Sequence, residues 1–179
     1  MNKSVSEVSV AVTGLGWAGG GIRTIDGAMT DLVRSALSSI DITAYSMTGG
    51  ASQVFDLIED RLAANVTVRL VVNRLQHQVP PARLWLARLL DRFPDNFLLW
   101  DYPQPEASEM AGLHAKVVVV DRARALVGSA NLSFLGLAAS HELAVVIDGQ
   151  AAITVARCVD RLVGSTYVRK ISQLKDFPG

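Results

Sequence analysis

The feature that most restricts the fold is an apolar stretch near residue 113 in which polar residues recur at fixed spacing. Residues 113–120 read as a buried strand that carries His114 and Lys116, and a turn leads to a second strand at 125–127. Because side chains two positions apart lie on one face of a strand, His114 and Lys116 are expected to point the same way. The stretch therefore predicts a β-hairpin that holds a histidine and a lysine side by side.

Strand-like and helix-like segments alternate along the rest of the chain. The expected strands are 5–13, 40–46, 66–72, 96–100 and 142–147, and the expected helices are 29–37, 53–64, 81–92 and 151–162. Such alternation favours an α/β fold with a mixed, largely parallel β-sheet flanked by helices, mixed because of the late hairpin. Half of the 179 residues are hydrophobic and no long linker interrupts them, so residues 1–179 are expected to form a single domain.

The hairpin is part of a longer pattern, H-x-K-x4-D-x6-G-S-x-N, which runs from His114 to Asn131 and is followed by Glu142. The pattern occurs once, because neither His77 nor His141 begins an H-x-K. An H-x-K-x4-D alone arises by chance in many proteins. The added G-S-x-N at this spacing, on a strand-like run, makes coincidence improbable.

This pattern resembles the signature of the phospholipase D superfamily, in its single-motif, bacterial nuclease-like branch. The resemblance extends over residues 27–147, and residues 38–48 are similar to a strand of that branch, with Met47 where phenylalanine is usual. Ser140 replaces the asparagine that the branch usually places two residues before the glutamate. The resemblance implies a phosphodiesterase that acts through a phosphohistidine intermediate, without a metal or other cofactor.

The resemblance also implies a role for each polar residue of the motif. His114 is expected to be the nucleophile, since a neutral imidazole can attack a phosphodiester whose charge repels anions. Lys116 and Asn131 are expected to hold the non-bridging oxygens and to offset the charge of the transition state. Glu142 is expected to accept from the His114 ring and to fix its tautomer; a solvated residue at the start of a strand is the alternative.

Three further motif residues are expected to support the site. Gly128 lets the backbone come close to the phosphate, and Ser129 is expected to donate either to the phosphate or to the Glu142 carboxylate. Asp121 lies an odd number of residues from His114, so on a continuous strand it points to the opposite face. We therefore expect Asp121 to be structural, tying the hairpin turn or pairing with a nearby cation.

A single copy of the motif leaves the leaving group without an obvious proton donor. Relatives with two motifs place their histidines across a pseudo-twofold axis, so one motif per chain implies a homodimer with His114 from each chain in one composite site. One histidine must then be neutral and the other protonated. Such a pair titrates as a unit, and the expected rate profile is bell-shaped in pH.

The formal net charge is zero, which is unusual for a protein that binds long nucleic acids without sequence preference. Two arrangements of the arginines remain open: a local basic cluster around the site, or ion pairs with Asp and Glu on solvated helix faces. The arginines concerned are Arg69, Arg74, Arg83, Arg88, Arg92, Arg122 and Arg124.

Other bulk features indicate an ordinary cytoplasmic protein. No apolar run reaches membrane-spanning length, no signal peptide is visible at the start, and no membrane insertion is expected. The lone Cys158 excludes an internal disulfide and fits a reducing compartment. Because Cys158 lies in an apolar helical pattern, we expect it to be buried in the core.

Two loops and one histidine have open roles. Residues 14–21 contain a G-x-G-x-x-G, but Gly19 to Gly21 disfavour the helix that a dinucleotide site needs. We expect instead a flexible loop near the site, with Trp17 stacking on a base or packing on a partner. Residues 101–112 are expected to border the cleft or to form a plain surface connection. His77 is expected to touch the substrate or to be simply exposed.

The predicted function is that of a metal-independent DNA endonuclease. A role in bacterial anti-phage defence, with partner proteins of such a system, rests on family analogy alone. Two alternatives remain: a phospholipase D that acts on phospholipid, and a non-catalytic module that binds nucleic acid through its phosphate site. Against the lipid alternative, no amphipathic basic helix is visible in the sequence.

Overall fold

The computed structural model describes residues 6–103, 112–173 and 176–177. Its centre is a nine-stranded sheet in the order β2-β1-β8-β7-β6-β3-β4-β5-β9. The strands are β1 (Glu7–Thr13), β2 (Arg23–Thr24), β3 (Ser39–Ala44), β4 (Thr67–Asn73), β5 (Phe97–Tyr102), β6 (Lys116–Val120), β7 (Arg124–Gly128), β8 (Glu142–Asp148) and β9 (Arg169–Ile171).

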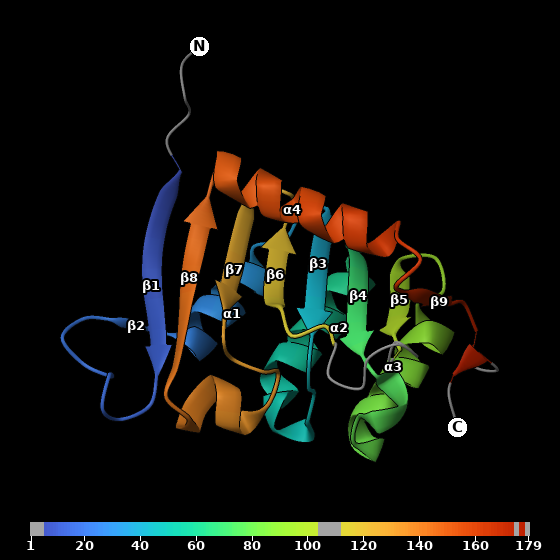
Figure 1. Ribbon diagram of the computed structural model, residues 1–179, viewed down its shortest axis with the longest axis horizontal. Helices are drawn as coiled ribbons and strands as arrows, with labels where there is room; N and C mark the ends of the chain where they lie inside the picture. The colour runs from blue at the N-terminus through green and yellow to red at the C-terminus, as the bar shows by residue number, and fades with distance from the viewer. Residues whose placement is uncertain (1–5, 104–111, 174–175, 178–179) are drawn as a thin grey trace, which may run out of the picture.

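Helices cover both faces of this sheet (Figure 1). α1 (Ile25–Arg34), α2 (Ser52–Ala63) and α3 (Pro80–Arg92) lie behind the sheet in this view, and α4 (Gln150–Val163) crosses its front. Short helical turns η1 (Gly49–Ala51) and η2 (Leu75–His77) precede α2 and α3, and a π-helical turn η3 (Leu135–Ala139) joins β7 to β8.

The predicted α/β fold with a mixed sheet flanked by helices is confirmed, but the expectation of a largely parallel sheet is wrong. β1–β2, β3–β4 and β4–β5 are parallel pairs, whereas the other five pairings among the described strands are antiparallel. Parallel neighbours need a crossover connection. The chain instead runs from β6 through β7 to β8 as consecutive antiparallel neighbours, and β1 then pairs antiparallel with β8.

Alternation along the central strands divides the core between the two faces. Val118 and Val120 of β6 join the large cluster under α1 to α3, whereas Val119 packs toward α4. On α4, Ala152 and Ala156 are fully buried against the sheet. The small side chains let this helix approach the strands closely, which fixes how it lies across them.

Cys158 is exposed, so the prediction that it lies in the core is wrong. α4 turns Ala152, Ala156 and Val159 toward the sheet, and this rotation leaves the thiol on the outer side. No helix in the described ranges is both long and apolar enough to cross a membrane.

Most expected elements are present with boundaries shifted by a few residues. The helix expected at 29–37 begins at Ile25, because the Thr24 hydroxyl caps it by accepting from Gly27 N at 3.1 Å. The short edge strands β2 and β9 and the turn η3 have no counterpart among the expected elements.

The strand expected at 113–120 begins only at Lys116, so His114 precedes it. Leu113 N donates to the side chain of Asn73 at 2.9 Å, and Ala115 O accepts from the Thr43 hydroxyl at 3.0 Å. At the start of this run, hydrogen bonds with side chains thus replace those with a neighbouring strand. They hold His114 at the end of the sheet where β6 begins.

The motif segments other than Asp121 meet at one end of the central strands, the lower end in Figure 1. Lys116 at the start of β6 pairs with Gly128 at the end of β7, and Gly128 pairs with Ala144 near the start of β8. Thr13 at the end of β1 pairs with Glu142. The register therefore gathers the polar residues of the motif in one place.

Candidate active site

His114 and Lys116 form the centre of the site. The Lys116 ammonium lies 3.1 Å from Nδ1 and 3.2 Å from Nε2 of the His114 ring, and it donates to the His114 carbonyl at 2.8 Å. The His114 side chain is exposed, while Lys116 is 8% exposed. An accessible imidazole next to a positive charge is an arrangement that can receive a phosphate group and attack it.

Tyr45 is a third member of this cluster that the sequence did not single out. Its ring lies 4.7 Å from the His114 ring, and the Lys116 ammonium lies 4.9 Å from its centroid. The second contact is a cation–π interaction. Tyr45 follows β3 directly, so the antiparallel pairing of β3 with β6 brings it to the histidine. That long-range pairing has no local sequence signal.

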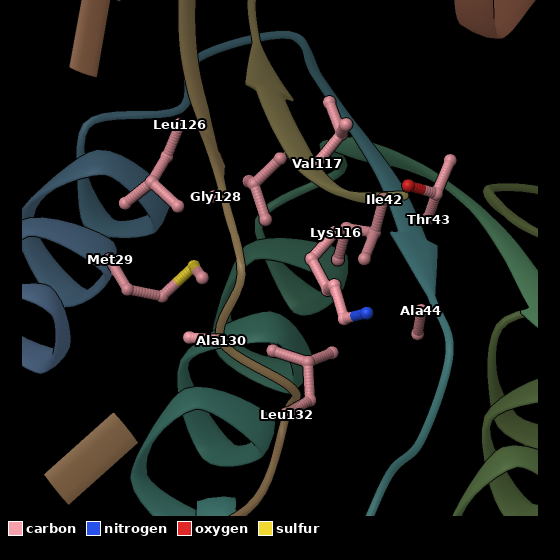
Figure 2. Close-up of a pocket in the computed structure, with 11 residues that line it drawn as sticks. Met29, Ile42, Thr43, Ala44, Lys116, Val117, Leu126, Gly128, Ala130 and Leu132 are labelled. Atoms are coloured by element: carbon pink, nitrogen blue, oxygen red, sulfur yellow. The ribbon is translucent and has the colours of Figure 1, made fainter. Parts of the chain in front are cut away.

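An apolar cavity surrounds the stem of Lys116. Figure 2 shows the lysine side chain between Ala130 and Leu132 on one side and Ile42 and Ala44 on the other. This burial lowers the pKa of Lys116, and the negative charge of Glu142 acts in the opposite direction. The ammonium is therefore a poorly solvated charge, which favours binding of an anion.

Gly128 and Ser129 connect β7 to the glutamate. A Cβ at Gly128 would lie 2.6 Å from the Ala144 Cβ and 2.7 Å from Leu143 O, so the close approach of β7 and β8 excludes a side chain there. Ser129 donates to the Glu142 carboxylate and accepts from Leu143 N at 3.2 Å. Of the two expected partners of Ser129, the single chain shows the glutamate.

Within a single chain, the described residues do not show the expected hydrogen bond between Glu142 and His114. Glu142 instead bonds Ser129 and acts on Lys116 through its charge. Asn131 is half-buried, and among the described residues its Oδ1 has no hydrogen-bond partner. Its neighbours Ala130 and Leu132 line the cavity around Lys116, which places the Asn131 segment beside this cavity.

Asp121 lies at the opposite end of β6 from these residues. Its carboxylate accepts from Leu37 N, from Ser38 N and Oγ, and from Ser39 N at 2.7–2.9 Å. These hydrogen bonds lower the pKa of Asp121 against the opposing effect of burial. The aspartate thus ties the β6–β7 turn to the start of β3, and it is remote from the site.

Most of the arginines considered above are paired with carboxylates. Arg69 and Arg122 bind Asp160, Arg88 and Arg92 bind Glu59, and Arg124 binds Asp148. Arg83 lines a surface groove with Leu84 and Phe177. Arg74 lines a cavity that also contains Tyr45, and His77 is exposed at the same cavity.

The glycine-rich loop before β2 is attached to the residue next to Glu142. Gly16 N donates to His141 Nε2 at 3.2 Å, and the Trp17 ring contacts the His141 ring edge-on at 5.6 Å. The helix α1 begins only at Ile25, so no helix opens within the glycine pattern. Of the loop at 101–112, residues 104–111 lie outside the described part, so its expected position at the cleft edge has no structural description.

Within the described ranges, no three His, Cys, Asp or Glu side chains lie close enough together to bind a metal ion. The positive charge at the centre of the site is that of Lys116.

The domain and its fold have counterparts in known proteins. The family described as "Cardiolipin synthase, PLD-like domain" matches residues 29–161. The DISARM protein DrmC of Bacillus paralicheniformis is 24% identical over 151 residues, which are 84% of this chain and 60% of the relative. The chain therefore spans about three fifths of the length of that relative.

Solved structures show the same fold. Nuc from Salmonella typhimurium, a phospholipase D family member, has a TM-score of 0.72 at 18% identity, over 93% of this chain and 99% of Nuc. NucT from Helicobacter pylori has a TM-score of 0.67 at 17% identity, over 89% and 98%. Phosphatidylserine synthase from Haemophilus influenzae has a TM-score of 0.70 at 14% identity, over 98% of this chain and 42% of the synthase.

The family match covers most of the chain, including His114, Lys116 and Glu142. The chain belongs to the phospholipase D superfamily and carries the PLD-like domain of that family.

Proposed function

We propose that the protein is a metal-independent DNA endonuclease that acts through a phosphohistidine on His114. The observation that carries the proposal is the accessible His114 ring with the poorly solvated Lys116 ammonium 3.1 Å from Nδ1. In this proposal residues 1–179 act as one phospholipase D-like domain. The fold supports it, because every described strand belongs to a single sheet.

The first step is attack of a ring nitrogen of His114 on phosphorus. The new P–N bond forms as the P–O bond to the leaving nucleoside breaks. Lys116 and the Asn131 amide hold the non-bridging oxygens and offset the charge that develops there. Water then attacks the phosphohistidine, the P–N bond breaks, and the imidazole is restored for the next turnover.

The leaving oxygen takes its proton from His114 of the partner subunit in a homodimer, and the same imidazole removes a proton from the attacking water. The chain has one H-x-K, and the described part of one chain brings no second histidine to His114. A twofold axis beside His114 would supply it. In this arrangement Ser129 and Glu142 keep Lys116 charged and orient the histidine pair.

The face of the sheet crossed by α4 supports the homodimer. Val8 pairs with Ile147, which packs against α4, and Val10 and Leu143 lie an even number of residues from this pair, so all three face the same side. They are 58%, 48% and 46% exposed. This apolar strip follows β1 and β8 to the end of the sheet at which the site lies. A second copy of the chain would cover it and bring the two sites together.

The experiment that tests the proposal is cleavage of end-labelled single- and double-stranded DNA in excess EDTA. We expect cleavage by the wild type and none by His114→Ala. The matched control is Arg34→Asn, at the end of α1 on the far side of the sheet, which should cleave normally. Absence of cleavage by the wild type, or cleavage by His114→Ala, would contradict the proposal.

The proposal includes a role in bacterial anti-phage defence together with partner proteins. Its support is the likeness to the DISARM protein DrmC, which is longer than this chain. Deletion of the gene in its native host should raise phage plating efficiency, and the His114→Ala allele should not restore protection. The exposed free thiol of Cys158 supports the cytoplasmic location that is part of the proposal.

One observation favours the lipid alternative. Phe134 and Leu135, which follow Asn131 in the site loop, are 58% and 63% exposed, and apolar side chains beside a phosphate site suit a membrane surface. The solved phosphatidylserine synthase shares the fold. Release of choline from phosphatidylcholine vesicles by the wild type, lost in His114→Ala and without DNA cleavage, would favour this alternative.

A further inference from the structure

We propose that Trp17, held against His141, is a stacking platform for an unpaired base near the catalytic residues. The inference rests on the proposed nuclease function and names its substrate class: a nucleic acid whose bases are single-stranded at the site. Trp17 is 44% exposed, whereas Trp85 and Trp100 are 7% and 9% exposed. Of the three tryptophans of the chain, Trp17 is therefore the one whose ring can meet a ligand.

The Trp17 ring is held by the histidine that precedes Glu142. It meets the His141 ring edge-on, with 5.6 Å between the centroids and an angle of 75° between the planes. Gly16 N donates to His141 Nε2 at 3.2 Å, and Trp17 N donates to Gly14 O at 3.1 Å. Because an edge-on contact covers at most one face of the indole, a face is left on which a base can stack.

Two glycines let the loop close around the histidine. A Cβ at Gly14 or at Gly16 would lie 2.8 Å from atoms of the His141 ring, and Gly14 has a φ of 95°. The Thr13 hydroxyl donates to Ser140 O at 2.8 Å, which ties the start of the loop to the residue before His141. A ring held in this way loses little freedom when a ligand binds, and that lowers the cost of stacking a base on it.

The platform lies at the end of the sheet that holds His114. The loop leaves the lower end of β1, where Thr13 pairs with Glu142 (Figure 1). In the sheet order, β1 is three strands from β6, which begins at Lys116. Three spacings of about 4.8 Å amount to about 14 Å, which is about four nucleotides at the 3.4 Å rise of a stacked strand. A base within a few nucleotides of a phosphate at His114 can thus reach Trp17.

The composition of the loop favours a base over a membrane surface. Residues 14–22 contain neither an acidic nor a basic side chain, and Arg23 is paired with Asp31. An anionic membrane would therefore meet no cation in this loop. A base offers an uncharged π face, while its phosphate is held elsewhere, by Lys116. Since a paired base has both faces covered inside a duplex, the platform selects single strands or locally opened ones.

The test is competition binding in the His114→Ala background, which removes turnover. The probes are a thymidine oligonucleotide of about six nucleotides, a length that single-strand sites accommodate, and its abasic analogue with the same phosphates. We expect the thymidine probe to compete about tenfold better, the value of stacking one base. Trp17→Ala should abolish the difference, and Trp17→Phe should keep most of it. Leu15→Ala is the matched control, since this residue is 96% exposed in the same loop, and it should keep the full difference.

Tryptophan fluorescence gives a second readout, because Trp85 and Trp100 are shielded from the solvent. The thymidine probe should quench the emission of Trp17, whereas the abasic probe and a blunt duplex should leave it unchanged. Trp17→Phe should remove the quenching. His141→Ala takes away the acceptor of Gly16 N and should weaken base discrimination and quenching together, and His141→Gln, which keeps an acceptor, should retain part of both.

Equal competition by the two probes, or an unchanged difference in Trp17→Ala, would overturn the platform. A blue shift of the Trp17 emission with phosphatidylcholine vesicles, without a response to the thymidine probe, would overturn it in favour of a lipid surface. A dimer weakened by Trp17→Ala with unchanged base discrimination would overturn it in favour of the subunit interface.

The result does not depend on cleavage. Base discrimination that is lost in Trp17→Ala, without DNA cleavage by the wild type, would sustain the platform and refute the nuclease. DNA cleavage by the wild type without base discrimination would refute the platform alone.

Discussion

Lys116 is the residue at which burial and charge act most directly on the chemistry. The apolar cavity lowers its pKa, and Glu142 opposes this effect. The lysine supports catalysis only in its charged form, which predominates below its pKa. The glutamate therefore contributes by keeping the lysine protonated, in addition to any effect on the histidine.

Glu142→Gln tests this contribution. The substitution removes the negative charge, so the pKa of Lys116 falls further and the charged form is lost at lower pH. We expect the pKa of the Lys116 ammonium, followed by NMR titration of the lysine in the absence of DNA, to be lower in the variant than in the wild type. An unchanged titration of Lys116 would contradict this contribution of Glu142.

Tyr45 is a positioning residue whose ring touches both His114 and Lys116. Tyr45→Leu removes the ring, and we expect kcat to fall about fivefold, since a cation–π contact contributes about 1 kcal/mol. Tyr45→Phe keeps the ring and should retain most of the rate. Steady-state kinetics on a short oligonucleotide measure both, and equal losses in the two variants would contradict a role for the ring.

The strand period predicted that His114 and Lys116 lie side by side, and the resemblance to the phospholipase D signature added Ser129 and Glu142 to the site. These four residues lie at one end of the sheet, as the register of β6, β7 and β8 shows. Tyr45 and the Asn73 side chain, which anchors Leu113, were not predicted. They reach the site through pairings of β3 and β4 that no local spacing encodes.

At the scale of elements, a charge network holds α4 against the sheet. Arg69 binds both oxygens of Asp41 at 2.6 and 2.7 Å and Asp160 at 2.8 Å, and Arg122 also binds Asp160. Asp41 is 2% exposed, so it depends on its partner. The network joins β3 and β4 to α4 across the sheet face.

Arg69→Ala should lower the free energy of unfolding by about 3 kcal/mol, because it leaves the Asp41 carboxylate buried without its partner. The double variant Arg69→Ala, Asp41→Ala should recover part of this loss. Urea denaturation monitored by circular dichroism measures both. A loss below about 1 kcal/mol in the single variant would show that the network contributes little.

The same network predicts sensitivity to acid. Hydrogen bonds and charge from Arg122 and Arg69 lower the pKa of Asp160 to about 2. This contribution is present above the pKa of an unfolded aspartate and is lost as the pH falls toward 2. Asp160→Asn should therefore flatten the decline in stability between about pH 4 and 2, seen in denaturation curves at each pH.

Asp121→Ala should lower stability by about 2 kcal/mol, because four donors at the start of β3 lose their acceptor. We expect kcat and KM of the folded enzyme to stay within twofold of wild type, since the carboxylate is at the far end of β6. A selective fall in kcat at unchanged stability would contradict a structural role.

Most elements were predictable because their apolar residues recur with the period of a helix or a strand. The repeated pattern stays recognisable even where a single residue departs from it. The parallel character of the sheet was overestimated, since periodicity reports the face that a strand buries and carries no information on its direction. The two-residue strand β2 and the three-residue strand β9 are too short to show a period. Cys158 was misplaced because α4 buries only a narrow face, made of Ala152, Ala156 and Val159.

At the scale of the whole molecule, the account requires two chains. Val10→Glu places a charge in the apolar strip beside α4, and we expect the dimer to weaken at least tenfold and cleavage to fall with it. Leu84→Glu alters a residue that is 73% exposed on α3, away from the strip, and should change neither. Light scattering measures the oligomeric state, and a cleavage assay at the same protein concentrations measures the activity. A monomer with full activity would refute the composite site.

Mixing subunits separates a shared site from independent ones. In wild type exchanged with His114→Ala, a site that needs both histidines gives activity that falls with the square of the wild-type fraction. Independent sites give a linear fall. A linear fall would contradict the shared site, but it would not contradict the role of His114 as the nucleophile.

The most direct test of the central claim is to trap the intermediate. Wild type and His114→Ala are mixed with a short DNA, quenched in alkali during turnover, and digested for mass spectrometry of the peptide that contains residue 114. The account predicts a covalent nucleotidyl adduct on His114 in the wild type and no adduct in the variant. Steady cleavage with an unmodified His114 peptide, or an adduct on another residue, would contradict it.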